Sequence, residues 1–131
     1  MDDNFKVEII SPEKIIFFGD TEMVILPSYE GDMGILKNHI PIITFLRPGI
    51  IKVRKNDDNF ENFFVEDGTI EFFQNTLVIL SSTAINLKNL SKTFIENLSN
   101  QAKEKLTQKD ITDHQRYIIN HKIDTLREIK I

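Results

Sequence analysis

The sequence contains no cysteine and no tryptophan among its 131 residues, and glycine and proline are scarce, at 5 and 4. The absence of cysteine excludes disulfide bonds, a thiolate nucleophile and a Cys-based zinc site. No apolar run approaches the roughly 18 residues of a membrane-spanning helix, so we expect any membrane association to go through a partner. The acidic start, MDDNFK, has neither the basic leader nor the apolar segment of a signal peptide, and we expect the protein to stay in the compartment where it is made.

The overall composition, with 40% hydrophobic and 27% charged residues, is typical of a globular protein with one domain, or one domain with an appendage. The net charge of −4 is unevenly distributed. Residues 1–87 carry 7 Lys and Arg against 14 Asp and Glu, whereas residues 88–131 carry 9 against 6. The acidic first part argues against nucleic acid as a partner, because phosphate binding requires clustered Lys and Arg. The mildly basic tail could meet an acidic protein surface.

The first part of the chain alternates short β-rich stretches with turn residues. Period-two alternation or β-branched runs predict strands at residues 5–9, 15–18, 22–26, 42–46, 49–54, 62–66, 69–73 and 76–80. Residues 56–59 and 74–75 predict turns, and Asp67-Gly68 is typical of a hairpin turn joining residues 62–66 to 69–73. We therefore expect residues 1–87 to form an antiparallel β-sandwich or flattened barrel of about ten short strands.

From Ala84 onward the spacing of apolar residues changes from two to about 3.6, which predicts two amphipathic helices. The stripe of the first, at about residues 90–107, consists of Leu90, Phe94, Ile95, Leu98, Ala102 and Leu106. The second begins at a capping box formed by Thr112 and Gln115, and its stripe consists of Ile111, Ile118, Ile119, Ile123, Leu126 and Ile129.

We expect residues 88–131 to form an antiparallel two-helix hairpin, so the fold class is mainly β followed by α. Such a hairpin is marginal alone in water, so its apolar stripes must pack against the sandwich or a partner. The choice between these two could act as a switch.

Between Pro27 and Gly49, turn residues interrupt otherwise apolar sequence. Residues 30–34, Glu-Gly-Asp-Met-Gly, predict a tight turn after a strand that ends near Leu26. Pro41 favours a sheet edge or a loop around residues 37–41, and Pro48-Gly49 marks a further turn.

The order of these residues resembles the epsilon subunit of F-type ATP synthase, the counterpart of the mitochondrial delta subunit. The family pattern of Glu-Gly, a further Gly, His-x-Pro, Thr and Pro-Gly is matched by Glu30, Gly31, Gly34, His39, Pro41, Thr44, Pro48 and Gly49. Upstream, residues 7–13 with Phe17 or Phe18 and Gly19 resemble the opening strand and turn of the family. The resemblance covers essentially the whole chain and implies a β-sandwich followed by a helical hairpin.

The resemblance implies a non-catalytic rotor subunit of the proton-translocating complex. In the family, the sandwich couples the foot of the gamma shaft to the membrane c-ring, and the surface from Glu30 to Thr44 makes these contacts. The implied partner contacts are Glu30, Gly31, Asp32, His39, Pro41 and Thr44. The resemblance also implies a peripheral position on the cytoplasmic face of the bacterial inner membrane, held through partners.

The helices of family members can inhibit ATP hydrolysis by contacting the catalytic alpha and beta subunits. Under the resemblance, the candidate contacts are the cations Lys103, Lys105, Lys109, Arg116 and Lys122, although cations on a helix are as often simply solvated. Some bacterial members also bind ATP through an Ile/Leu-Asp-x-x-Arg-Ala motif at the start of the first helix. Here Ser91, Phe94 and Ile95 replace the acid, the arginine and the alanine, so we expect no ATP binding, or only very weak binding, and no cofactor.

Several sites for other chemistry are weakly supported. His39 with Glu30 and Asp32 suggests a metal or acid–base site, but one histidine without a second clustered ligand favours a structural or interface role. His114 and His121 share a helix face and are expected to be solvated. The spacing of Gly31 and Gly34 lacks the Gly-Lys-Ser/Thr ending and the following helix of a phosphate loop.

Two other classes of protein remain as alternatives. A small β-sandwich ligand-binding module would need a concave patch of exposed aromatic residues, whereas most of the 10 phenylalanines fit core positions. A small enzyme would need a clustered acid, base and nucleophile, and the sequence has no Gly-x-Ser-x-Gly elbow.

Overall fold

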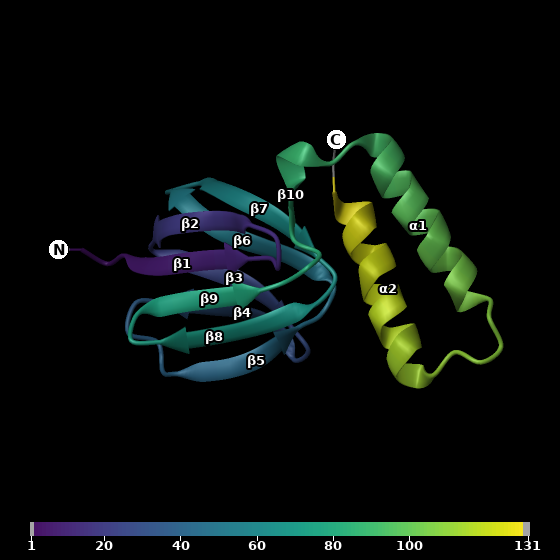
Figure 1. Cartoon of the computed structure of the whole chain (residues 1–131), viewed down its shortest axis with the longest axis horizontal. Coiled ribbons are helices and arrows are strands. Elements are labelled where there is room, and N and C mark those ends of the chain that lie inside the picture. Colours follow the sequence, from purple (N-terminus) through teal and green to yellow (C-terminus); the bar gives the residue numbers. More distant parts are fainter. Residues whose placement is uncertain (1, 130–131) are drawn as a thin grey trace.

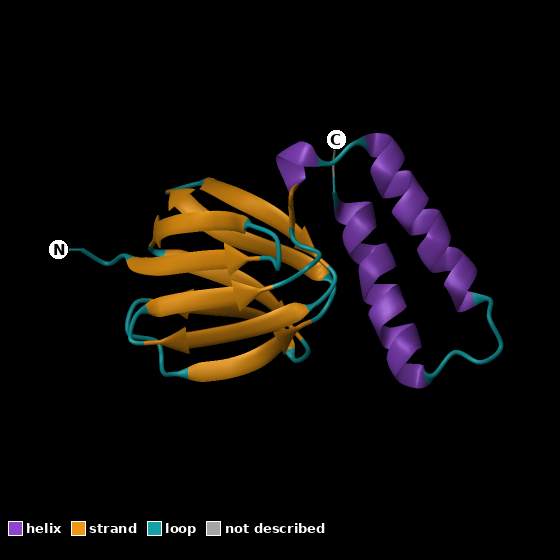
Figure 2. Cartoon of the chain, viewed as in Figure 1, coloured by secondary structure: helices purple, strands orange, loops and turns teal. Residues whose placement is uncertain are grey.

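The computed structural model describes residues 2–129 and shows a β-sandwich followed by a pair of helices (Figure 1), with strands and helices segregated along the chain (Figure 2). The strands of this described part are β1 (Phe5–Ile10), β2 (Ile15–Thr21), β3 (Met23–Ser28), β4 (Gly31–Leu36), β5 (Ile42–Leu46), β6 (Gly49–Asn56), β7 (Asn59–Val65), β8 (Gly68–Phe73), β9 (Thr76–Leu80) and β10 (Ile85–Asn86). They are followed by the 3-10 helix η1 (Leu87–Asn89) and by the α-helices α1 (Lys92–Leu106) and α2 (Asp113–Glu128). The predicted fold class, a sandwich of about ten short strands followed by two helices, is confirmed.

The strands form two sheets packed face to face, and a single pairing of Ser28 with Leu46 links them. The first sheet has the order β5-β8-β9-β1-β2, and the second sheet has the order β10-β7-β6-β3-β4. In Figure 1 the first sheet faces the viewer and the second lies behind it. Most neighbours are antiparallel, as predicted, but β1 and β9 are parallel. A parallel pair needs a long connection, and here all of β2 to β8 lies between its two strands.

The predicted hairpin at Asp67-Gly68 is wrong, because the two strands that it would join lie in different sheets. β7 pairs with β6 and β10, whereas β8 pairs with β5 and β9. Gly68 begins β8 with a φ of 151°, where a Cβ would also lie 2.5 Å from the carbonyl oxygen of Leu80. The Asp-Gly pair therefore lies in a crossover between the two sheets, where both the positive φ and the close approach of Leu80 require glycine. A sequence pattern does not distinguish such a crossover from a hairpin turn.

The turn predicted at residues 30–34 occurs earlier in the chain. Ser28 of β3 pairs with Gly31 of β4, so Tyr29 and Glu30 form the connecting loop and Gly34 lies within β4. Among the strands of residues 2–129, β4 pairs only with β3 and forms an edge of the second sheet. The turns predicted at residues 56–59 and 74–75 are confirmed as the ends of the β6–β7 and β8–β9 hairpins.

The main core lies between the two sheets and is formed by the inward-facing side chains of alternate strand positions. Its fully buried members include Val7, Ile9, Leu26, Ile35, Ile51, Phe63, Ile70, Phe72, Leu77 and Ile79. Each such side chain contributes roughly 1.5–3 kcal/mol relative to an exposed one. This core therefore makes the sandwich rigid, so that the residues on its surface are held in fixed positions.

Both helices begin at side-chain caps. The Ser91 hydroxyl accepts a hydrogen bond from the amide of Phe94 at 3.1 Å, so α1 starts after Ser91 and Leu90 lies outside it, two residues later than predicted. The predicted capping box of α2 is confirmed: the amide of Gln115 donates to the Thr112 hydroxyl at 3.1 Å, and the amide of Thr112 donates to the Gln115 side chain at 2.9 Å.

The hairpin packs against the end of the second sheet through a second apolar cluster. The buried members are Phe64 of β7, Leu90 and Leu126, with Ile50, Ile85, Leu87, Ile95, Leu98 and Ile129 around them. Phe94 is 40% exposed, so its place in the predicted stripe is wrong. Within residues 2–129, neither helix combines the length and the hydrophobicity that crossing a membrane requires.

Candidate partner interface

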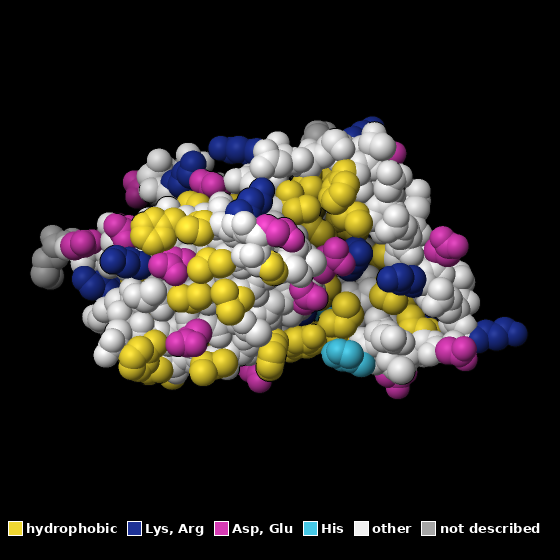
Figure 3. Space-filling model, viewed as in Figure 1, with side chains coloured by type: hydrophobic (Ala, Val, Ile, Leu, Met, Phe, Trp, Pro, Cys, Tyr) yellow, Lys and Arg dark blue, Asp and Glu magenta, His cyan; other side chains and the backbone are white. Residues whose placement is uncertain are grey.

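The solvent-facing side of the first sheet, which we call the outer face, exposes several large apolar side chains. The strand register places Ile43, Glu71, Val78, Glu8 and Phe18 side by side across all five strands. A neighbouring row contains Phe45, Thr69, Leu80 and Ile10. Ile43, Phe45 and Phe18 are 77%, 62% and 63% exposed. Figure 3 shows hydrophobic side chains over this sheet with acidic side chains between them.

Contiguous exposed apolar side chains of this kind are typical of an interaction surface. The carboxylates of Glu8 and Glu71 flank Val78 within it, and no ion pair within residues 2–129 involves either of them. The next row of the outer face adds the exposed side chains of Lys6 and Asp20, so the outer face combines an apolar area with charges of both signs. It therefore suits a partner surface that is mainly apolar and carries charged side chains.

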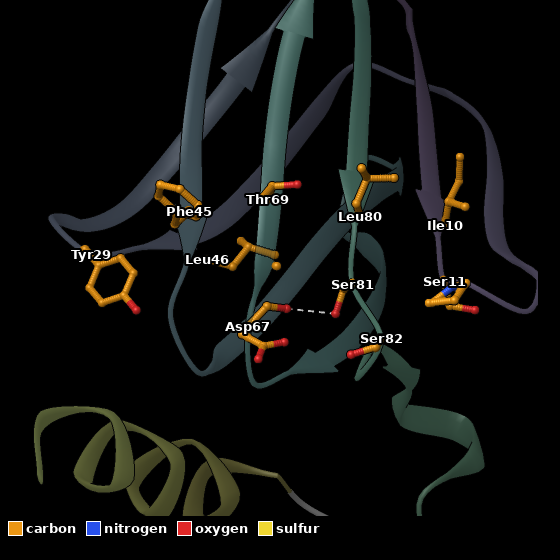
Figure 4. A pocket seen from close by; sticks show the side chains of 12 residues that line it. Ile10, Ser11, Tyr29, Phe45, Leu46, Asp67, Thr69, Leu80, Ser81 and Ser82 are labelled. Carbon is orange, nitrogen blue, oxygen red and sulfur yellow. Dashed lines mark hydrogen bonds between the residues drawn. The ribbon is translucent and has the colours of Figure 1, made fainter. Parts of the chain in front are cut away.

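At the helix-facing end of the outer face lies an open pocket of ≈ 650 Å³, shown in Figure 4. Phe45, Leu80 and Ile10 form its apolar side, and Tyr29 lies at its border with α2. The Ser81 hydroxyl at its base donates to the carbonyl of Asp67 at 2.8 Å, which fixes the crossover. No acid, base and nucleophile converge there, so the pocket extends the apolar surface.

The residues implied as partner contacts by the sequence do not form one cluster. Glu30, Gly31 and Asp32 lie at the helix-facing end of the sandwich, where the Asp32 carboxylate is 3.6 Å from the guanidinium of Arg47. His39 and Pro41 belong to the β4–β5 loop, which a hydrogen bond from Asn38 to Asn75 holds beside the β8–β9 turn. Figure 1 shows the β8–β9 turn at the end of the sandwich away from the helices.

The opposite end of the sandwich is fixed by hydrogen bonds. The amide of Asn38, which has a positive φ of 67°, donates to the side chain of Asn75 at 2.7 Å, and Asn75 donates back to Asn38 at 3.0 Å. The His39 ring packs edge to face on Phe72 at 5.8 Å. His39 thus contacts the sandwich through Phe72, and its contact with a partner stays a prediction.

Thr44 pairs with buried Ile70 and so points toward the interior of the sandwich, whereas its neighbours Ile43 and Phe45 point outward. The outer face was not predicted from the sequence, because β-branched and aromatic runs such as residues 42–46 do not show which side faces the core. The sequence contained one indication of this face. Apolar residues occupy both odd and even positions of β5, which is expected of a strand covered on both faces.

The hairpin contacts the sandwich along a second functional candidate, which we call the seam: the contacts of α2 residues 114–125 with Tyr29, Pro48 and Glu66. The Tyr29 ring stacks on His114 and Tyr117, with centroids 6.0 and 5.9 Å apart. The Tyr117 hydroxyl donates to the Tyr29 carbonyl at 3.0 Å. The tip of the β3–β4 loop therefore holds the side of α2.

Two polar contacts continue the seam toward the end of α2. Lys122 pairs with Glu66 at 2.7 Å, and its side chain is only 16% exposed. The Thr125 hydroxyl lies 2.7 Å from the His121 carbonyl and 3.4 Å from the Pro48 carbonyl. Burial lowers the pKa of His121 below its usual value of 6.5, and the guanidinium of Arg47 lowers this pKa further, whereas Asp124 raises it.

The five cations considered as inhibitory contacts differ in how accessible they are to another protein. Lys103 and Lys105 on α1, Lys109 in the loop and Arg116 on α2 are exposed. Lys122 is engaged by Glu66 and is available to another protein only if the hairpin leaves the sandwich.

The residues at the start of α1, where some family members have a nucleotide motif, contribute to the fold of this chain. Ser91 caps α1, Phe94 is partly exposed and Ile95 packs against the second cluster. No group of three or more His, Asp or Glu side chains that could hold a metal ion occurs between residues 2 and 129. His39 lies at the opposite end from Glu30, so the three residues considered for a metal site are not brought together.

Comparison with known proteins identifies relatives over the whole chain. The model of the ATP synthase delta/epsilon chain beta-sandwich domain matches residues 4–87. An ATP synthase epsilon chain of Pelagibacter ubique is 44% identical over 98% of this chain and 99% of its own length. An ATP synthase epsilon chain of Parvibaculum lavamentivorans is 31% identical over 99% of this chain and 98% of its own length.

Solved structures share the fold at low sequence identity. A chain from the OSCP/F1/c-ring structure of the Euglena gracilis mitochondrial ATP synthase matches with a TM-score of 0.79 and 17% identity, over 97% of this chain and 81% of that chain. A chain from the central stalk/c-ring structure of the Tetrahymena thermophila mitochondrial ATP synthase matches with a TM-score of 0.58 and 16% identity, over 93% and 90%.

Proposed function

Because this chain belongs to the delta/epsilon chain family of ATP synthase, we propose that it is a non-catalytic rotor subunit that fastens the gamma shaft to the membrane c-ring. Torque from proton flow then reaches the catalytic head without slippage. A clamp of this kind must be stiff, and a close-packed core between two sheets supplies stiffness.

The outer face is the observation that carries this proposal. It exposes Ile43, Phe45, Phe18 and Leu80 on one firm sheet, and it is not covered by the hairpin, which packs on the second sheet. We assign the outer face to the gamma subunit. A stable protein contact buries about 800 Å² on each partner, and an apolar area spread over five strands suits a surface of that size.

The c-ring contact belongs to the sandwich end around His39 and Pro41. There Leu36, Ile40 and Phe73 are exposed, and the asparagine pair Asn38 and Asn75 links the β4–β5 loop, which carries Ile40, to the β8–β9 turn beside Phe73. The protein would then be peripheral to the membrane, on the cytoplasmic face of the bacterial inner membrane, and held there through its partners.

For the hairpin we propose a second role as a brake on ATP hydrolysis, through contact with the catalytic alpha and beta subunits. The exposed cations Lys103, Lys105, Lys109 and Arg116 suit an acidic surface on those subunits, and release of the hairpin would add Lys122 to them. Nucleotide does not control this brake here, because Ser91, Phe94 and Ile95 leave no charged pair to hold a base and phosphates.

The gamma assignment is tested by co-purification with the gamma subunit of the same organism. Aspartate at both Ile43 and Phe45 is expected to abolish the complex, because desolvating two new carboxylates costs several kcal/mol. The matched control is Lys52→Asp, which makes the charge more negative on the second sheet, beside α2 and away from the outer face, and it should leave gamma binding intact. Binding that survives the double change, or that is lost equally in the control, contradicts the assignment.

A third variant tests the residues implied by the sequence. His39→Arg alters the exposed end of the sandwich and should weaken attachment to the c-ring while leaving gamma binding intact. Thr44 is unsuitable for such a test, because a bulky charge there would enter the core and unfold the sandwich.

A further inference from the structure

The seam contains two of the three histidines of the chain, His114 and His121. We propose that the seam is a pH-sensitive latch, in which uptake of a proton by His121 releases the hairpin from the sandwich. The proposal rests on the proposed braking role, because release has a consequence for hydrolysis only if the hairpin then reaches the catalytic subunits.

An aromatic chain leads from the sandwich to His121. Tyr29 stacks on Tyr117, and the Tyr117 ring meets the edge of the His121 ring with centroids 4.4 Å apart. The same Tyr117 hydroxyl donates to the Tyr29 backbone, so the three rings are held by one polar anchor. A change in the charge or orientation of His121 therefore acts directly on the contact that holds α2.

On the sandwich side, cations face His121. It shares a hollow of ≈ 300 Å³ with Arg47 and Lys52, between α2 and the second sheet. Arg47 is partly neutralised by Asp32 at 3.6 Å, and its guanidinium donates to the Pro48 carbonyl at 2.9 Å, so it cannot easily turn away. A proton on His121 places a further positive charge beside this fixed guanidinium.

On the helix side, carboxylates oppose this effect only in part. Asp124 and Glu128 line the same hollow, and Asp124 favours the protonated ring. Asp124 is itself shared with Arg127 at 3.9 Å and is largely exposed, which weakens its influence. Lys122, the remaining charge beside His121, is neutralised by Glu66.

The direction of the pH dependence follows from the two environments of His121. When the hairpin is docked, burial and Arg47 lower the pKa of His121, whereas in a released hairpin the ring is solvated and its pKa returns to about 6.5. Well above pH 6.5 the ring is neutral in both forms and docking is unaffected. As the pH falls below 6.5 the released form binds a proton that the docked form does not, so docking weakens until the pH passes the lowered pKa.

The absence of cysteine allows a direct test in the full-length chain. Cysteines introduced at Asn59 on the sandwich and Gln108 in the helix–helix loop, both exposed, carry spin labels for distance measurement between pH 8 and pH 5.5. We expect a single distance at pH 8 and a second population that grows as the pH falls below 6.5. A distance distribution that does not change with pH overturns the latch.

Two substitutions separate His121 from other acidic effects. His121→Phe keeps a ring against Tyr117 but cannot titrate, and should remain docked throughout the pH range. His114→Gln removes an exposed histidine whose ring only stacks on Tyr29, and should keep the pH response. Acid release that persists in His121→Phe contradicts the proposal.

The titration of His121 is measured directly from its ring signals by NMR, in an isotope-labelled chain without spin labels. A titration midpoint below 6.5 supports the latch, and one at or above 6.5 overturns it. Hydrolysis assays on the assembled complex address the brake separately. Acid release of the hairpin without any change in hydrolysis would remove the braking role and leave the latch intact.

Discussion

Gly49 shows how a residue of the family pattern serves the fold. A Cβ at this position would lie 2.4 Å from the Cβ of Pro27 on the neighbouring strand, whereas Gly34 has open space around it. We expect Gly49→Ala to lower the free energy of unfolding by about 1–3 kcal/mol, because the two backbones cannot separate without loss of core contacts.

Urea unfolding of the full chain measures this difference, with Gly34→Ala as the matched control. Gly34 is not at positive φ and lies in a strand, so alanine there should change the stability little or slightly raise it. Equal midpoints for the two variants would contradict the close approach at Gly49.

Ser91 caps α1 at the position where the nucleotide motif of some family members has an acidic residue. Loss of its cap in Ser91→Ala should destabilise the start of α1 by about 1 kcal/mol, measured as faster amide exchange in the first turn. Ser91→Asp should keep the cap, since aspartate is an equally good N-cap residue.

Ser91→Asp also restores the acid of the nucleotide motif, which makes it a sharp test of the expected absence of ATP binding. Phe94 and Ile95 still replace the arginine and the alanine, so neither the native chain nor this variant should give a saturable calorimetric signal at physiological ATP. Clear saturation by the native chain would show that its nucleotide site uses other residues.

At the scale of elements, Leu126 joins α2 to the second sheet. It is 3% exposed and packs with Phe64 and Leu90. We expect Leu126→Ala to weaken docking of the hairpin by about 2–4 kcal/mol while leaving the main core intact, because the two clusters are separate.

Hydrogen exchange distinguishes these two parts of the molecule. In the variant, the amides of α2 should lose protection while those of β1 and β9 keep it. The exposed neighbour Arg127 provides the control, and Arg127→Ala should change neither. Parallel loss of protection in the helices and the sandwich would mean that they unfold as one unit.

Sequence patterns predicted most of the individual elements, because these are set by local chemistry, although no strand was predicted at β4 or β10. The strand at residues 5–9, the capping box at Thr112 and the turn at residues 74–75 depend on residues close together in the chain. Pairing between distant strands leaves no such local signal. The parallel contact of β1 with β9 and the crossover at Gly68 were therefore not foreseen.

The candidate site was predicted less well for the same reason. Residues 30–44 were identified as a stretch, but only the register of the first sheet shows that Ile43 and Phe45 face outward and Thr44 inward. The contributions of Leu80 and Phe18 come from strands 35 and 25 residues away from Phe45 and Ile43, and local periodicity carries no information about such neighbours.

For the whole molecule, the two candidate surfaces lie on different sheets. The outer face belongs to the first sheet, and the hairpin covers the end of the second. The proposed clamp and the proposed brake thus use different surfaces, so we expect shaft binding and hairpin movement to be separable.

Removal of residues 88–131 tests that separation. The shortened chain should still bind gamma, and the complex assembled with it should hydrolyse ATP faster than the complex with the full chain. A full-length variant with glutamate at Lys103, Lys105 and Lys109 should show the same increase if those cations make the braking contact. Unchanged hydrolysis with both would remove the brake from the account.

The most direct test of the central claim is a map of which side of the sandwich the shaft covers. Single cysteines at Ile43 and Val78 on the outer face, and at Lys52 on the opposite sheet, are alkylated in the free chain and in its complex with gamma. We expect gamma to slow alkylation strongly at the first two positions and to leave alkylation at the third unchanged. If gamma protects Lys52→Cys while Ile43→Cys and Val78→Cys still react, the shaft lies on the second sheet and the assignment is contradicted.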